Sequence, residues 1–70
     1  MMKVYVFNSG QIGWPGKIHD LKLIDLCMDP EDRPYAIVEN PYFRGETLQA
    51  TFTPNLGAND GKDCWVVDMD

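Results

Sequence analysis

Three side chains in this sequence could act as a nucleophile or a general base, namely His19, Cys27 and Cys64. Catalysis by such a pair needs the thiol within hydrogen-bond reach of the imidazole, and the imidazole needs an orienting partner. Cys27 follows His19 by a span of roughly 26 Å in an extended chain, and no local signature connects His19 with Cys64. We therefore predict that the protein is not an enzyme, and we keep catalysis by these residues as the least favoured hypothesis.

The chain also lacks the patterns of a metal or cofactor site. It has one histidine and no Cys-x-x-Cys pair to begin a zinc site. The segment 59–63 resembles a calcium loop faintly, but lacks its carboxylate spacing, its terminal glutamate and its flanking helices. We predict no metal and no cofactor. We expect both cysteines to be reduced, small apolar groups, with a single disulfide as the alternative.

The charge balance is acidic, with eleven Asp and Glu residues against six Lys and Arg residues and a formal net charge of −5. Direct binding of nucleic acid needs clustered basic residues, so we predict against it. The acids form a solvated surface, or they attract basic partners, or they imitate the charge of DNA. They gather in two groups: Asp25, Asp29, Glu31 and Asp32, and then Asp60, Asp63, Asp68 and Asp70.

The length of 70 residues predicts a single domain over residues 1–70. No window approaches the roughly 18 apolar residues of a membrane-spanning helix. The segment Met1–Gly10 lacks the apolar region of a signal peptide. We therefore expect no membrane association and a cytoplasmic location.

Short strands separated by turn residues are the dominant pattern. Alternating or β-forming residues predict five strands, and no segment predicts a helix longer than a short turn at Pro54–Leu56. We expect one long strand over Lys17–Cys27, with a bulge or bend near Leu23 and Ile24. The fold class is therefore all-β, as a small five-stranded barrel or a strongly bent antiparallel sheet with little helix. The strands are Lys3–Phe7, Lys17–Cys27, Tyr35–Glu39, Thr47–Thr53 and Cys64–Met69.

Three short segments resemble the Src-homology-3-like barrel group, including its small KOW-type members. They are Pro15–Ile18, Tyr35–Glu39 and Phe52–Leu56. The resemblance implies a small barrel that binds peptides, RNA or partner subunits, and that is seldom an enzyme. The acidic charge argues against the RNA-binding members of the group.

Large aromatic residues in loops are the best candidates for a binding site. Trp14 lies in Gly-Trp-Pro-Gly, and Tyr42, Phe43 and Arg44 lie between Pro41 and Gly45, outside any strand alternation. Exposed aromatic and arginine side chains are typical of binding hot spots. In the alternative, these rings fold back to cap a thin barrel. A turn containing Asp29, Glu31 and Asp32 would attract basic partners.

We therefore predict a non-enzymatic protein-binding module with an unidentified protein partner. The alternative from another class is a small acidic inhibitor, such as a virus-encoded protein, that occupies a basic nucleic-acid channel on a host protein. Salt would weaken that second kind of binding strongly. Unpaired strand edges also leave room for a homodimer.

Overall fold

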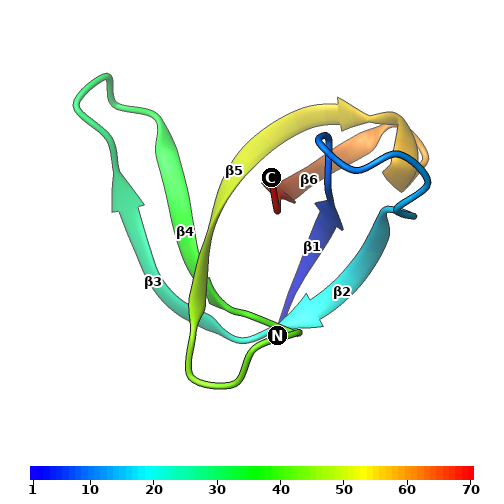
Figure 1. Cartoon of the computed structure of the whole chain (residues 1–70). Helices are drawn as coiled ribbons and strands as arrows, with labels where there is room; N and C mark the ends of the chain where they lie inside the picture. Colours follow the sequence, from blue (N-terminus) through cyan, green and yellow to red (C-terminus); the bar gives the residue numbers. More distant parts are fainter.

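The computed structural model describes residues 1–70 and consists almost entirely of strands (Figure 1). The prediction of an all-β domain with little helix is confirmed. No helix has the length and apolar composition needed to cross a membrane. The elements are β1 (Met2–Phe7), β2 (Lys17–Leu21), β3 (Leu23–Met28), β4 (Pro34–Glu39), β5 (Thr47–Leu56), the 3₁₀ turn η1 (Gly57–Asn59) and β6 (Lys62–Asp68).

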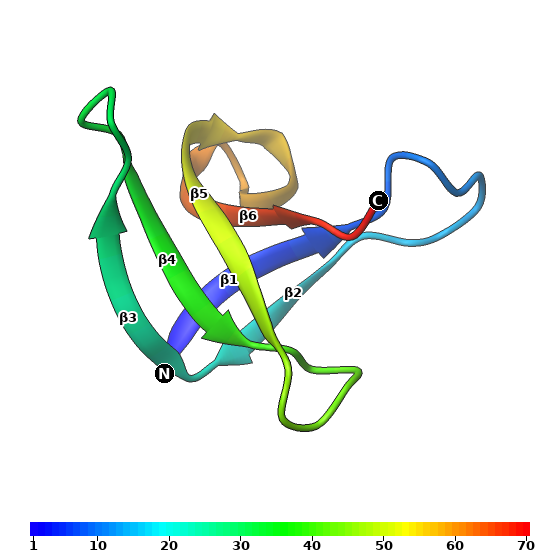
Figure 2. The same ribbon diagram turned by 60° about the vertical axis from the view of Figure 1, so that its left-hand side comes forward.

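All six strands belong to one strongly bent sheet in the order β2-β1-β6-β5-β4-β3 (Figure 2). The pairs are antiparallel except β1 and β6, which run parallel. The sheet is therefore mixed, and it is not closed into a barrel. The expected five strands become six because the second expected strand is divided.

That division falls at Lys22, between β2 and β3, which lie at opposite edges of the sheet. The backbone N–H of Lys22 donates to the Glu39 carboxylate (3.1 Å), and the N–H of Glu39 donates to the Lys22 carbonyl (3.1 Å). The register with β4 then shifts between Leu23 and Asp25, which makes Ile24 the extra residue of a bulge. The predicted bend near Leu23 and Ile24 is confirmed, and the single long strand is replaced by two.

Buried side chains lie on the inner face of the bend. Directly opposed residues of antiparallel strands share a face, and the pairing of Ala36 with Ala50 places two fully buried residues together. Leu48 of β5 also packs against the core, whereas Phe52 of the same strand stays 39% exposed. The core cluster has seven residues, which is small: Val4, Val6, Leu21, Ala36, Val38, Ala50 and Val67.

The end of β5 differs from the short helical turn expected at Pro54–Leu56. β5 continues through Leu56, and the 3₁₀ turn follows at Gly57–Asn59. Asp60 and Gly61 then both adopt positive φ (55° and 75°), and the Gly61 N–H donates to the Leu56 carbonyl (2.9 Å). This tight turn brings Lys62 of β6 opposite Leu56, and that pairing extends β5 to Leu56.

Candidate functional site

The structure brings three rings from separate segments together at one end of the sheet. The Tyr42 ring packs against both Trp14 and His19, with its centroid 5.8 Å from that of Trp14 and 5.6 Å from that of His19, both in edge-on geometry. The Tyr42 hydroxyl and His19 Nε2 are 3.1 Å apart and form a hydrogen bond. Trp14 and Tyr42, two of the residues predicted for binding, are therefore in contact.

The loop that carries Tyr42 is held by hydrogen bonds among its own residues. The side-chain oxygen of Asn40 accepts the N–H groups of Tyr42 (2.9 Å) and Phe43 (3.3 Å), as an Asx turn does. The Asn40 N–H donates to the Glu46 carbonyl (3.0 Å), and the Glu46 N–H donates to the Phe43 carbonyl (3.2 Å). Gly45 supplies the positive φ (85°) that completes the reversal. Residues 40–46 thus form a well-defined turn, which we call the aromatic loop.

The three predicted rings differ in exposure. Trp14 is half-buried and packs against the core, so it partly follows the expectation that loop rings fold back. Tyr42 is 46% exposed and Phe43 is 58% exposed. Arg44, next in the chain, is exposed and makes no ion pair. The accessible part of the predicted aromatic site is therefore Tyr42, Phe43 and Arg44, and the half-buried Trp14 packs against Tyr42.

His19 also belongs to this cluster, which no pattern in the sequence indicated. Its side-chain partner is the Tyr42 hydroxyl and not a thiol. The Cys27 thiol instead lies 3.6 Å from Asp25 Oδ2, and the buried Cys64 thiol contacts the carbonyl of Trp65 (3.3 Å). The histidine and the two free thiols thus have separate partners.

The predicted acidic turn lies at the opposite end of β4 from the aromatic loop, as Figures 1 and 2 both show. It connects β3 to β4, and six residues of β4 span roughly 20 Å. Asp29, Glu31 and Asp32 are therefore not part of one continuous patch with Tyr42 and Phe43.

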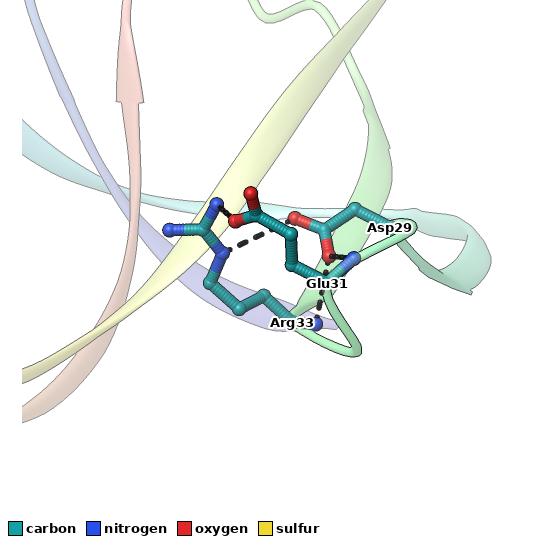
Figure 3. A network of polar contacts seen from close by, with 3 residues as sticks. All are labelled: Asp29, Glu31 and Arg33. Atoms are coloured by element: carbon teal, nitrogen blue, oxygen red, sulfur yellow. Dashed lines mark hydrogen bonds and ion pairs between the residues drawn. The ribbon is translucent and has the colours of Figure 1, made fainter.

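Some carboxylates of the acidic turn already have hydrogen-bond and ion-pair partners within the turn (Figure 3). Asp29 Oδ1 accepts the backbone N–H groups of Glu31 (2.9 Å) and Arg33 (2.8 Å). The Arg33 guanidinium pairs with Asp29 (3.4 Å) and with Glu31. Asp32 adopts a positive φ of 60° and makes no ion pair. Three carboxylates and one guanidinium leave this turn with a formal charge of −2.

Other acids also serve the backbone. Asp68 accepts hydrogen bonds from the Ser9 hydroxyl (2.5 Å), the Ser9 N–H (3.1 Å) and the Asp70 N–H (3.0 Å), which hold the pKa of Asp68 below its ordinary value. Asp63 accepts the N–H of Asn55 (3.1 Å). These carboxylates shape turns and chain ends, which leaves fewer of the acids free for a charged partner.

Next to the acidic turn, Tyr35 lies opposite Cys27 on the β3–β4 pair. The hydrogen bond with Cys27 is the main cause that raises the pKa of the Tyr35 hydroxyl, with smaller contributions from the charge of Cys27, burial and the nearby carboxylates. A hollow here is lined by Asp29, Arg33, Pro34, Tyr35, Thr51 and Phe52. Nowhere do three side chains gather that could hold a metal ion.

An exposed apolar row on the edge strand β3 was not foreseen from the sequence. Leu23, Ile24, Leu26 and Met28 are 43%, 53%, 59% and 60% exposed. Leu23 lies opposite Val38 and Leu26 opposite Ala36, so both are on the inner face of the bend. The alternation predicted a strand, but it could not indicate that this strand has a neighbour on one side only.

The fold and these surfaces define a small all-β domain with a structured aromatic loop and an apolar sheet edge. No protein-family model matches the chain, and no curated protein or solved structure is significantly similar to it.

Proposed function

We propose that this chain is a non-enzymatic protein-binding module whose contact residues are Tyr42, Phe43 and Arg44. The observation that carries the proposal is Phe43, a large apolar ring that is 58% exposed on a loop held by its own hydrogen bonds. A soluble domain gains no folding free energy from the exposed part of that ring. A partner surface that covers Phe43 would bury this apolar area, and that burial would contribute to the free energy of binding.

The order of the loop supports the same function. Binding costs less when the contact side chains are already placed, because fewer rotamers and loop conformations are lost. Asn40 fixes the backbone of the aromatic loop, and Trp14 and His19 support the Tyr42 ring. Aromatic and arginine residues such as Phe43 and Arg44 are also the types that contribute most at binding hot spots.

The acidic turn at the other end of β4 contributes in a different way. With its formal charge of −2, in a chain of −5, it attracts basic proteins over a distance of about a Debye length. Its role would be in the rate of association and not in the contact itself. The compartment, which we take to be the cytoplasm, and the resemblance to the Src-homology-3-like group stay predictions.

The test is affinity capture from a lysate of the source organism, with the wild-type domain, a Phe43→Ala variant and an Ile12→Ala variant. Ile12 is a fully exposed apolar residue in the loop before Trp14, which makes it a matched control. We expect wild type and Ile12→Ala to capture the same protein. Phe43→Ala should bind that protein at least about tenfold more weakly, which corresponds to about 1.4 kcal/mol of binding free energy. Circular dichroism must show that all three variants are folded.

Two other outcomes would count against the aromatic loop. If Phe43→Ala retains the same protein as wild type, the exposed ring is not the contact. If moderate salt alone releases the protein from every variant, the acidic surface is the site, and the charge-imitating inhibitor becomes the better hypothesis.

A further inference from the structure

The two edge strands of the sheet differ in how well they are protected from pairing with another strand. Proteins usually guard an edge with charged side chains, proline or a bulge. β2 carries Lys17, His19 and Asp20, and Asp20 forms an ion pair with Lys3 (3.3 Å). β3 also has a charged residue, Asp25, and the bulge at Ile24 near its start, but four of its six side chains are exposed and apolar.

No other strand of the chain pairs with the free edge of β3. Its only neighbour in the sheet is β4, and Figures 1 and 2 show no element beyond it. The backbone N–H of Leu26, in the middle of the strand, donates to the adjacent Asp25 carboxylate (2.9 Å). A carbonyl of an added strand could take the place of that carboxylate.

The two ends of this edge differ in charge. Lys22, just before β3, makes no ion pair, and the Glu39 carboxylate that accepts its backbone N–H offsets its charge at this end. The acidic turn follows directly after β3 and has a formal charge of −2. Two such edges in antiparallel contact bring each Lys22 to the acidic turn of the other, whereas parallel contact opposes like charges.

We propose that a second copy of this chain pairs antiparallel with β3 to form a twofold symmetric dimer with Leu26 on the axis. A twofold interface of this kind is self-complementary, and its antiparallel arrangement brings each acidic turn to a lysine and keeps the two acidic turns apart. The two six-stranded sheets then form one continuous sheet. This surface is separate from the aromatic loop, so the dimer does not depend on the proposed function.

The alternation of side chains selects the register. Leu26 and Met28 are on the inner face, and Asp25 and Cys27 are on the outer face, because of their partners on β4. An axis at Leu26 opposes Leu26 to its own copy, Ile24 to Met28, and Asp25 to Cys27. An axis at Asp25 would oppose two carboxylates, which is unfavourable.

Sedimentation analysis of the purified chain from about 1 µM to about 1 mM tests the dimer. We expect a concentration-dependent dimer in wild type and at least a tenfold weaker dimer in Leu26→Lys, because a lysine at the axis faces its own copy. Ile12→Lys is the matched control, since it adds the same charge at an exposed apolar position in a distant loop. It should dimerise like wild type, and so should Phe43→Ala.

A charge exchange tests the orientation. Lys22→Glu should weaken the dimer, and the added Glu31→Lys change should restore it in part. A wild-type monomer at about 1 mM would overturn the proposal. A dimer that Leu26→Lys leaves intact, or one that Phe43→Ala abolishes, would do so too, since either result places the interface elsewhere.

Oxidative cross-linking tests the register directly, in a Cys27→Ser background. Opposed antiparallel residues lie about 4.5–5.5 Å apart at Cα, which suits a disulfide. Leu26→Cys should therefore cross-link to its own copy under copper-phenanthroline oxidation. Ile24→Cys should not, because four residues along the strand separate the two copies by about 13 Å. The reverse pattern would overturn the axis at Leu26.

Discussion

At the scale of single residues, Asp68 connects the two ends of the chain. Its carboxylate holds Ser9, which follows β1, beside the last residues of β6. Those hydrogen bonds lower the pKa of Asp68 in the folded state. The contact therefore stabilises the fold fully above the unfolded-state pKa of about 3.9, and the stabilisation is lost as the pH falls through the folded-state value.

A comparison of wild type with Ser9→Ala measures this contribution. The urea midpoint of wild type should exceed that of Ser9→Ala near neutral pH, and the difference should shrink as the pH falls below the unfolded-state pKa of about 3.9 and through the lower folded-state value. Asp68→Asn is the control, because it removes the titrating group, and adding Ser9→Ala to it should leave little pH dependence in the difference. A constant difference between wild type and Ser9→Ala across this range would exclude Asp68 as the source.

The residue types of the aromatic site were predictable, but their neighbours were not. Trp14 and Tyr42 stand out in the sequence because they lie in loops rich in glycine and proline. Nothing in the sequence indicated that Tyr42 contacts both Trp14 and His19, since residues 14, 19 and 42 meet only after β2 and β4 have taken their places. The same holds for Asp29, whose carboxylate shapes the turn in which it lies.

At the scale of elements, the aromatic loop depends on Gly45. Its φ of 85° suits glycine, and an added Cβ would meet no atom within 4 Å. Gly45→Ala therefore strains the backbone without a clash, at a cost of about 1–2 kcal/mol. Part of that cost would be relieved by loosening residues 40–46.

We expect Gly45→Ala to weaken binding through Phe43 although the ring itself is unchanged. Amide exchange of Phe43 and Glu46, measured by NMR, should become faster, while the amides of β1 and β6 stay protected. Gly57→Ala is the matched control, because Gly57 also has free space around its Cβ position but is not among the residues with positive φ. Unchanged exchange in the aromatic loop would show that Gly45 does not hold it.

The strands were the most predictable elements, and the division that makes β2 and β3 two separate edge strands was the least predictable feature. Alternation and turn residues located β1, β4 and most of β5 and β6, because side chains on a half-buried strand repeat every two residues. The same pattern runs through Lys22 without a break, so the division into β2 and β3 was hidden. It arises from long-range pairing, with Leu21 opposite Met2 and Leu23 opposite Val38.

At the scale of the whole molecule, the order of the strands follows from contacts between distant segments. The parallel pairing of β1 with β6 joins Val4 to Trp65 and Val6 to Val67 across almost the entire chain. Local sequence carries little information about such a pairing, which explains why the expected barrel or bent antiparallel sheet did not include a parallel pair. The class, all-β with little helix, depends on local pattern and was therefore predictable.

The core that results is thin, and its stability should depend on few side chains. Val66 and Val67 are adjacent on β6 and point to opposite faces; Val67 is 3% exposed within the core, whereas Val66 is half-buried outside it. Val67→Ala should cost about 2–3 kcal/mol, and Val66→Ala less than about 1 kcal/mol. In a domain of this size the first change lowers the melting temperature by roughly 10 °C or more.

Protein concentration must be held constant in that comparison, because a dimer stabilises the folded state by mass action. If β3 pairs with a second copy, the melting temperature of wild type rises with concentration, whereas that of Leu26→Lys does not. The difference between Val67→Ala and Val66→Ala should persist in the Leu26→Lys background, since the core lies within one chain. Equal effects of the two valine changes in that background would mean that the inner face of the sheet is not the core.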